Sequence, residues 1–377
     1  MEFDLTWILV GLPVAFALGW VASRLDLRQL RIANRQAPRA YFKGLNFLLN
    51  EQQDKAIDAF IEAVQNDPDT SELHFALGNL FRRRGEYDRA VRVHEHLLSR
   101  GDLGTADRQR AQHGLALDFL KAGLLDRAED ALRKLEGSPF EGQARLARLA
   151  IYERSREWPQ AAEVAALLER SGEVNFSVRQ AHYLCEQARE AHARGEGAQA
   201  VKILEEALRL APDAPRARIL LGQLWLHLGQ PQKAFETLAL LFQKGDSTAL
   251  LACSSLVKAA QAAALQDAAR QLLLEHYARQ PGIDSLDALG QLETEAEDTA
   301  NGRYLQHLQG HPSLIAATRW LGTRNLPAPV LKALEQAVRP LSRYRCAACG
   351  FEAREHFWHC PGCQAWDSYP PRRIEEL

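Results

Sequence analysis

The sequence repeats itself with a period close to 34 residues, and this constrains the fold more than any other feature. The stretch GLNFLLNEQQDKAIDAFIEAVQNDP, which begins at Gly44, recurs as GNLFRRRGEYDRAVRVHEHLLSRGD from Gly78. A period of this length is typical of solenoids, in which each unit buries its apolar face against the next. Alanines keep the register through seven copies, at separations of 34, 38, 33, 39, 34 and 34 residues: Ala56, Ala90, Ala128, Ala161, Ala200, Ala234 and Ala268.

Other positions of the repeat also have a constant character. A large residue such as Phe60, Leu204 or Leu238 is placed to fill the space between two closely packed helices, and Pro68 and Pro212 end the second helix of their units. This pattern resembles the tetratricopeptide repeat, a pair of antiparallel helices. Twelve positions before most of the alanines stands a second small residue: Gly44, Gly78, Ala116, Ala188 or Gly222.

The repeat is not uniform along the chain. Leu149 and Leu256 stand where the fourth and seventh units should have a small residue, and the pattern fades after Pro281. We therefore expect an array of about seven units over residues 37–282, followed by degenerate repeats and capping helices over residues 283–341. The net charge of -2, with 25% charged residues, argues against a nucleic-acid-binding polycation.

Four of the six cysteines lie near the end of the sequence, in RCAACGFEAREHFWHCPGC. Two C-x-x-C pairs separated by ten residues predict one tetrahedral site for iron or zinc, and a closed shell of four thiolates is typical of a structural metal. A redox pair is the alternative, but it would need a thioredoxin-like unit of its own. The expected ligands are Cys346, Cys349, Cys360 and Cys363.

The surroundings of these cysteines resemble the knuckles of rubredoxin over residues 342–369, ahead of a tail of residues 370–377. Gly350 and Pro361 fit that pattern, whereas Gln364 stands where rubredoxins have glycine. His356 and His359 are expected beside the metal rather than on it. An aromatic core around the knuckles is expected from Tyr344, Phe351, Trp358 and Trp366.

The first 23 residues predict a transmembrane anchor. Leu5 to Ala22 is an uncharged stretch of eighteen residues, long enough to cross the hydrocarbon of a bilayer. A cleaved signal peptide and a buried core helix are the alternatives, but neither a basic start nor an A-x-A site is present. A basic juxtamembrane helix is expected over residues 24–36. Five arginines lie in it or just after it: Arg24, Arg28, Arg31, Arg35 and Arg39. By the positive-inside rule they predict a periplasmic N-terminus and place the bulk of the chain in the cytoplasm.

A tetratricopeptide array offers a concave groove lined by the first helix of each unit. Side chains there can engage the backbone or the acidic side chains of a partner. Solvated helix faces are the alternative explanation for each residue. Projection of the helices places five polar residues near the groove: Asn79, Arg82, Arg189, Arg216 and Gln223.

The whole chain resembles the lipopolysaccharide assembly protein B family, most clearly in NFLLNEQQDKAID, LGNLFRRRGEYDRA, GLLDRAEDAL and YRCAACGFEAREHFWHCPGCQAW. The resemblance implies an all-α tetratricopeptide-repeat solenoid with an N-terminal transmembrane helix and a small C-terminal rubredoxin-like or zinc-ribbon module. It also implies a location in the inner membrane and a role in controlling lipopolysaccharide synthesis. In that role, the protein presents the UDP-acyl-GlcNAc deacetylase of the lipid A pathway to a membrane-bound AAA+ metalloprotease.

The resemblance implies further partners, namely an inner-membrane regulator that senses lipopolysaccharide and other lipopolysaccharide assembly proteins. The sequence contains no P-loop, nucleophile elbow or H-E-x-x-H motif, so we expect an adaptor rather than an enzyme and no nucleic-acid partner. A general scaffold for lipopolysaccharide assembly and transport is the alternative. A redox or nucleic-acid-binding metalloprotein ranks below both. Direct handover of a substrate and allosteric activation of the protease are two alternative ways in which such an adaptor could act.

Overall fold

The computed structural model describes residues 42–66, 70–172, 175–292, 297–322 and 326–377, together with the helical residues 16, 18 and 20. The predicted anchor and the five juxtamembrane arginines lie outside these residues, apart from those three isolated positions. Within the part that is described, no helix combines the length and the apolar character needed to cross a bilayer.

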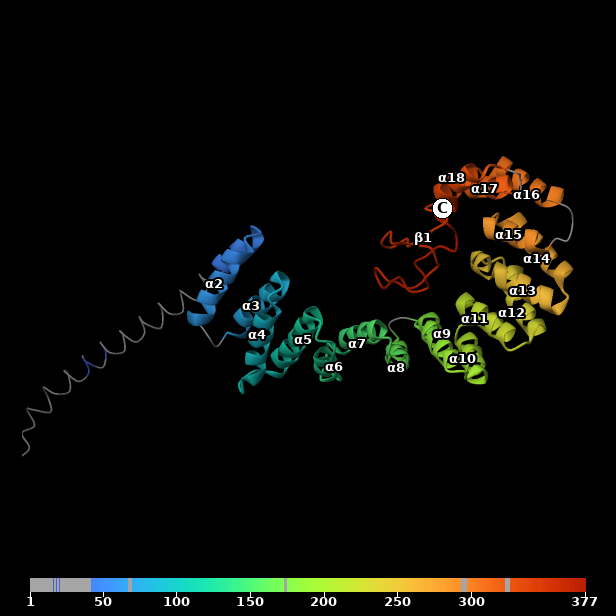
Figure 1. The fold of residues 1–377 in the computed structure, drawn as a ribbon. Coiled ribbons are helices and arrows are strands. Elements are labelled where there is room, and N and C mark those ends of the chain that lie inside the picture. Colours follow the sequence, from blue (N-terminus) through green and yellow to red (C-terminus); the bar gives the residue numbers. More distant parts are fainter. Residues whose placement is uncertain are drawn as a thin grey trace, which may run out of the picture. The chain divides into compact units, whose positions relative to one another are not determined.

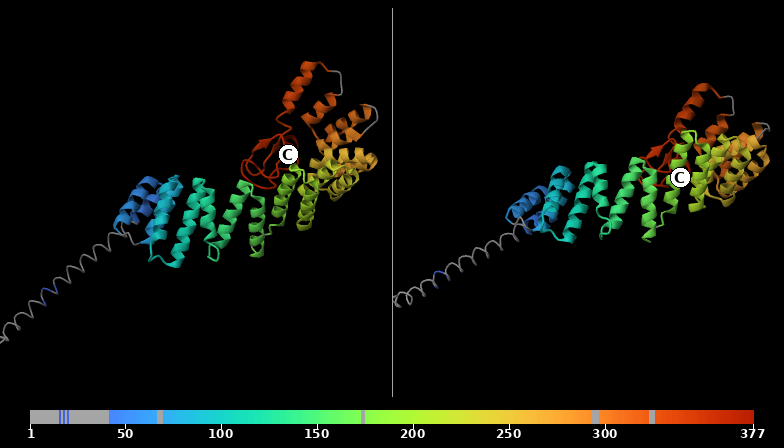
Figure 2. Two further views of the ribbon diagram at one scale, coloured as in Figure 1. Left: turned by 60° about the horizontal axis from the view of Figure 1, so that its bottom comes forward. Right: turned by 90° about the horizontal axis from the view of Figure 1, so that it is seen from below.

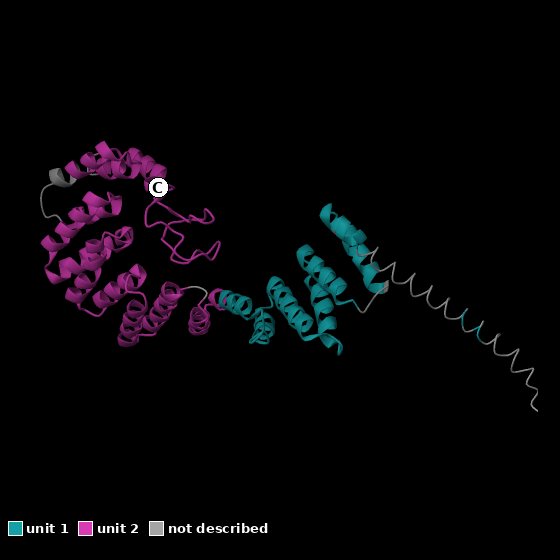
Figure 3. Cartoon of the chain, turned by 180° about the vertical axis from the view of Figure 1, so that it is seen from behind, with its two compact units in different colours: residues 1–151 teal, residues 152–377 magenta. Residues whose placement is uncertain are grey.

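The chain divides into two compact units, residues 1–151 and residues 152–377, and both consist mainly of helices (Figure 3). In the first unit, residues 42–49 are helical and precede the following helices (Figure 1): α2 Gln53–Asn66, α3 Ser71–Arg84, α4 Tyr87–Ser99, α5 Thr105–Ala122, α6 Leu125–Arg133 and α7 Glu141–Ser155, whose last residues belong to the second unit.

The second unit continues the pairing of antiparallel helices and then adds the cysteine-containing segment. Its elements are α8 Trp158–Arg170, α9 Ser177–Ala193, α10 Gly197–Leu210, α11 Pro215–His227, α12 Pro231–Lys244, the 3₁₀ helix η1 Ser247–Ala252, α13 Cys253–Ala263, α14 Gln266–Arg279, α15 Ile283–Leu292, α16 Glu297–Gly310, α17 Leu314–Gly322, α18 Ala328–Val338, the antiparallel strands β1 Tyr344–Arg345 and β2 Glu352–Ala353, and η2 Ile374–Glu376.

Seven helix pairs turn through one residue in the left-handed conformation, and a buried alanine follows that residue five positions later. Gly229, with φ 68°, precedes the buried Ala234 in this way. Glycine tolerates this conformation without a steric penalty, whereas other residues are strained in it. The seven left-handed residues, each five positions before a fully buried alanine, are Glu51, Gly85, Gly123, Arg156, Gly195, Gly229 and Ala264.

This regularity corrects one position of the predicted register. Ala268 is exposed, and Ala269 is the fully buried alanine of its pair. The reason is that α13 ends at Ala263, and the left-handed backbone of its C-cap residue Ala264, with φ 57°, fixes the entry into α14. The other six predicted alanines are all fully buried.

The small residues of the repeat are needed for close packing. A Cβ atom placed on Gly44 would lie 2.9 Å from the ring of Phe60, and one on Gly222 would lie 2.5 Å from Leu238. Both distances are shorter than van der Waals contact, so only glycine fits against these large side chains. The predicted roles of Phe60 and Leu238 as gap-filling residues are therefore confirmed.

Candidate metal centre and the surface that holds it

Four cysteine thiols converge in the segment of residues 344–370, which we call the ribbon. The Sγ atoms of Cys346 and Cys363 are 3.8 Å apart, those of Cys349 and Cys360 are 3.7 Å apart, and all four lie within 4.8 Å of one another. A tetrahedral ion with metal–sulfur bonds of about 2.3 Å needs sulfur atoms about 3.8 Å apart. The four cysteines therefore fit one iron or zinc ion, as the sequence predicts.

The two C-x-x-C pairs form matching turns that aim the thiols inward. In the first turn, the N–H of Gly350 donates to the carbonyl of Cys346 over 2.9 Å, and Gly350 has φ 77°. In the second, the N–H of Gln364 donates to the carbonyl of Cys360 over 2.9 Å, and Gln364 has φ 62°. Gln364 thus adopts the left-handed conformation of the glycine that rubredoxins carry there.

The electrostatics of the thiols favour a bound cation. Desolvation by burial opposes ionisation of Cys346, but its hydrogen bonding with the Ser368 side chain and with backbone groups lowers its pKa to about 6. A hydrogen bond from the Phe351 backbone favours the thiolate of Cys349, but desolvation and the neighbouring thiols raise its pKa to about 12. Cys346 therefore ionises readily, whereas ionisation of Cys349 beside it is unfavourable. A bound divalent cation compensates the negative charge and so allows both thiols to ionise.

Two histidines lie near the thiols without joining them. The Nε2 atom of His356 is 3.0 Å from the carbonyl oxygen of Tyr369, and that of His359 is 3.0 Å from the carbonyl oxygen of Gln364. Burial lowers the pKa of both imidazoles. Each ring therefore serves as a neutral hydrogen-bond donor that holds a loop of the ribbon.

The ribbon lies beside helices of the second unit (Figure 2). A buried carboxylate, that of Glu153, links the two. Glu153 accepts two hydrogen bonds of 2.7 Å from Arg179, one of 2.5 Å from the hydroxyl of Tyr183, and one of 3.0 Å from the indole N–H of Trp366. Burial and the bond to Glu153 raise the pKa of Tyr183, so this hydroxyl stays a donor. Four donors thus compensate a charge that would be costly to bury alone.

Trp366 is the centre of the contact. Its ring stacks between those of His182 and His359, with centroid distances of 4.8 and 4.3 Å, and meets Tyr183 edge-on at 5.9 Å. The next residue, Asp367, lies 2.9 Å from Nε2 of His182. The contact therefore combines aromatic packing with a directional polar pair, which fixes the orientation of the ribbon.

The predicted aromatic core of the ribbon is only partly correct. Tyr344 is buried with Cys346, Cys360 and Tyr369, but Phe351 is exposed. Trp366 lies between the ribbon and the helices and is only partly buried. A short two-stranded segment has little interior, so this side chain packs against the array.

The residues after the ribbon bind it to later helices of the same unit. Arg373 donates a hydrogen bond of 2.6 Å to Asp284 in α15. The carboxylate of Glu376 accepts from the N–H of Ile283 over 2.9 Å, and that of Glu375 accepts from the N–H of Ile315 over 3.1 Å. Both carboxylates therefore cap the positive ends of helices, α15 and α17.

In the first unit, the predicted groove residues Asn79 and Arg82 line a hollow of about 460 Å³. The guanidinium of Arg82 donates to the buried Asp118 over 2.8 Å and to Asn79 over 2.5 Å. Asp118 is also 2.5 Å from Nδ1 of His94. Arg82 thus belongs to a polar network inside the unit.

In the second unit, Arg189 of α9 and Gln223 of α11 line one small hollow of about 90 Å³, beside His192 and His227. Arg189 is largely exposed, with only a weak ion pair of 3.3 Å to Glu186. Arg216 is buried instead, with 4% of its surface exposed. It pairs with Glu186 and lies 5.9 Å from the ring of Trp366. The ribbon thus covers this position, and partner binding by the five residues stays a prediction.

The sequence analysis did not identify the residues that hold the ribbon, among them Glu153, Arg179 and His182. One signal was available. Glu153 lies beside the buried residues Ile151 and Tyr152, and a carboxylate in such a setting requires buried donors.

Comparisons with known proteins agree with these observations. Residues 344–370 match the rubredoxin metal binding domain, and residues 73–109 and 191–262 match tetratricopeptide repeats. Among solved structures, a tetratricopeptide repeat protein from Parabacteroides merdae is 16% identical, with a TM-score of 0.34, covering 68% of this chain and 99% of that one. A similarity this low carries no argument about function.

Two relatives match over nearly the whole length. Lipopolysaccharide assembly protein B of Escherichia coli strain K12 is 32% identical over 378 residues, which cover 96% of this chain and 97% of the relative. The protein of the same name from Haemophilus influenzae is 30% identical, with 97% and 98% covered. The repeated helix pairs, the four-cysteine ribbon and this full-length similarity lead to one conclusion: the chain belongs to the lipopolysaccharide assembly protein B family.

Proposed function

We propose that this protein is an adaptor without catalytic activity that regulates lipopolysaccharide biosynthesis at the inner membrane. It presents the UDP-acyl-GlcNAc deacetylase of the lipid A pathway to a membrane-bound AAA+ metalloprotease for degradation. The observation that carries the proposal is the similarity to lipopolysaccharide assembly protein B over 96–97% of the chain.

The architecture supports this proposal. A tetratricopeptide array supplies surfaces for binding proteins, and four thiolates close the metal shell against substrate. An inner-membrane regulator that senses lipopolysaccharide and other assembly proteins are further partners of the proposed adaptor. A general scaffold that assembles lipopolysaccharide synthesis and transport proteins is the second candidate, and it is favoured by the word "assembly" in the relatives' name.

The proposed location is the inner membrane, with residues 1–23 as a single-pass anchor, the N-terminus in the periplasm and the bulk on the cytoplasmic side. Tethering to the same membrane as the protease raises the effective concentration of both, so weak contacts suffice. Reporter fusions at residue 377 test the topology. Activity of a periplasmic reporter there contradicts it.

The proposed partner surface in the second unit is the hollow that Arg189 and Gln223 share, because Arg189 is exposed and only weakly paired. Arg189→Glu reverses the charge of this exposed side chain. Arg209→Glu is the matched control, since Arg209 is an exposed arginine of α10 that pairs with Glu206 of its own helix.

The half-life of the deacetylase in cells is the decisive measurement. It should lengthen when the protein is deleted, and Arg189→Glu should lengthen it while Arg209→Glu leaves it unchanged. If complete deletion leaves the half-life unchanged, the adaptor proposal fails and the general scaffold becomes the better account. If deletion lengthens it but Arg189→Glu does not, the binding surface lies elsewhere.

A further inference from the structure

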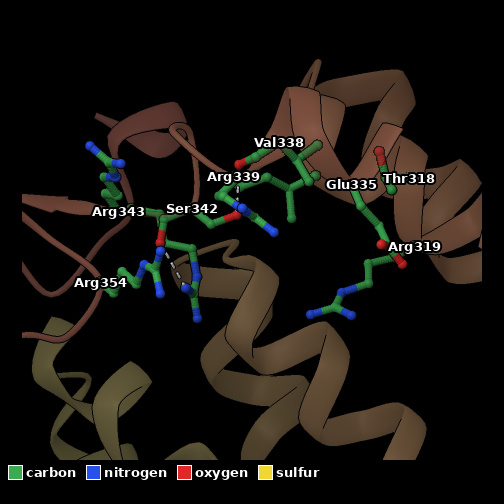
Figure 4. A pocket seen from close by; sticks show the side chains of 10 residues that line it. Thr318, Arg319, Glu335, Val338, Arg339, Ser342, Arg343 and Arg354 are labelled. Atoms are coloured by element: carbon green, nitrogen blue, oxygen red, sulfur yellow. Dashed lines mark hydrogen bonds between the residues drawn. The ribbon is translucent and has the colours of Figure 1, made fainter. Parts of the chain in front are cut away.

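A cavity of about 550 Å³ lies in the second unit between α17, α18, the ribbon and the segment that follows it. It is lined by five arginines and a single carboxylate, that of Glu335 (Figure 4). The arginines come from separate parts of the chain: Arg319, Arg339, Arg343, Arg354 and Arg373.

Three of these arginines have a carboxylate partner outside the lining. Arg373 is 2.6 Å from Asp284, Arg319 is 3.5 Å from Asp287, and Arg343 is 3.6 Å from Glu352. The last two distances are long for a hydrogen-bonded pair. The positive charge of the cavity is therefore only partly compensated.

The remaining two arginines, Arg339 and Arg354, are exposed and form no ion pair with any residue that the structure describes. Figure 4 shows Arg319 and Arg339 directed toward the same space, whereas the Arg343 side chain extends away from them. The guanidinium groups that line one cavity repel one another, and an anion bound between them would be attracted to each of them.

The lining favours a compact anion with several acceptor oxygens. Guanidinium groups present a planar fork that matches the oxygens of phosphate. The hydroxyls of Thr318 and Ser342 already donate to backbone carbonyls of Leu314 and Val338, so the arginines are the donors that remain. The volume lies within the range of small-molecule sites, about 300–1,000 Å³.

We propose that this cavity binds a phosphate-bearing ligand, either a soluble phosphorylated compound or the phosphate of a lipid headgroup. Arg354 belongs to the ribbon, Arg373 to the segment after it, Arg319 to α17, and Arg339 directly follows α18. A bound phosphate therefore clamps the ribbon to α17 and α18. The proposal does not depend on the adaptor function.

Calorimetric titration of the full-length, metal-loaded protein tests the site. The probes are inorganic pyrophosphate and water-soluble dihexanoyl phosphatidic acid, with dihexanoyl phosphatidylcholine as the comparison, because its zwitterionic headgroup has no net charge and is expected to bind more weakly. We expect saturable binding that weakens as sodium chloride is raised, because salt screens exposed charges. The double variant Arg339→Gln/Arg354→Gln should bind at least about tenfold more weakly, since it lacks two charge-assisted contacts.

The matched control is Arg154→Gln/Arg170→Gln, which removes two exposed arginines elsewhere in the same unit. Metal content and circular dichroism verify that both double variants are folded. Binding of pyrophosphate identifies a soluble phosphate as sufficient, and binding of phosphatidic acid alone identifies a headgroup. The proposal is overturned if neither phosphate probe binds, if the control loses as much affinity as the test variant, or if a hexaglutamate peptide binds more tightly than both.

Discussion

Trp366 in the ribbon donates its indole N–H to Glu153 at the end of α7, 213 positions earlier in the chain, over 3.0 Å. The same carboxylate is held by Arg179 and Tyr183, so the ribbon completes a buried polar cluster that the helices begin. The metal site and the helical array are therefore energetically coupled, although their residues are far apart in sequence.

Trp366→Phe should destabilise the second unit by about 1.5–3 kcal/mol, because it removes a hydrogen bond to a charged, buried group while keeping an aromatic ring in place. Urea unfolding of the full chain measures the change. Phe351→Leu is the control, since Phe351 is an exposed aromatic of the same ribbon, and it should change the free energy of unfolding by less than about 0.5 kcal/mol. Equal effects of the two variants would show that the contact with Glu153 contributes nothing specific.

Cys360→Ser should abolish metal binding, unfold the ribbon and expose α9, while most of the helical signal in circular dichroism remains. Metal analysis and hydrogen exchange at His182 and Tyr183 measure the two effects. Cys185→Ser is the control, because Cys185 is buried in α9 and burial raises the pKa of its thiol to about 12, which keeps it protonated. Full metal content in Cys360→Ser would exclude Cys360 as a ligand.

Ala264→Gly should stabilise the second unit by about 0.5–1 kcal/mol, because Ala264 has φ 57° and glycine adopts this conformation without the Cβ penalty. Gly229→Ala, at the corresponding turn with φ 68°, should destabilise it by about 1 kcal/mol. Thermal unfolding of both variants checks the opposite signs. A shift in the same direction for both would contradict the strain argument.

The stability of the second unit should fall as the pH decreases from about 7 to 5. His276 is fully buried, and burial lowers its pKa. The charges of Arg279 and Arg372 lower it further, and the hydrogen bond to the Asp246 carbonyl, which raises it, is the weaker effect. Between the pKa values of the two states, the folded state binds fewer protons than the unfolded state. The contribution of neutral His276 to the free energy of unfolding is therefore complete above the unfolded pKa of about 6.5, and it is lost as the pH falls through the lower pKa of the folded state.

His276→Gln should reduce this pH dependence, measured as the free energy of urea unfolding at several pH values. His227→Gln, which replaces an exposed histidine of α11, should retain the wild-type dependence. An unchanged slope in His276→Gln would assign the effect to other groups, such as His307, whose pKa is also lowered by burial.

The repeat and the metal ligands could be predicted because local spacing determines both. A left-handed turn residue and a buried alanine recur at a fixed interval, and four thiols on two tight turns must converge. The register failed at Ala268 because two alanines stand side by side at positions 268 and 269, and the turn before them has Ala264 in place of a glycine that would fix the count. Glu51 and Arg156 likewise adopt the left-handed conformation at two other turns where most units have glycine.

The contact between the ribbon and the array could not be predicted from spacing. Glu153, His182 and Trp366 lie on segments with no common period, and only the folded second unit brings them together. The same holds for the arginine cavity, whose residues are unremarkable one by one. Arg216 illustrates the difficulty most clearly, because helical projection places it on an open surface, whereas a distant segment covers it.

The caps of α15 and α17 have a consequence for biosynthesis. Glu376 accepts from the N–H of Ile283 and Glu375 from that of Ile315, at sequence separations of 93 and 60 residues. A ribosome translates dozens of codons after each of these helices before the carboxylate that caps it emerges from the exit tunnel. Both helix starts therefore lack these carboxylate caps on the nascent chain, and the second unit reaches its final stability only after translation has passed Glu376.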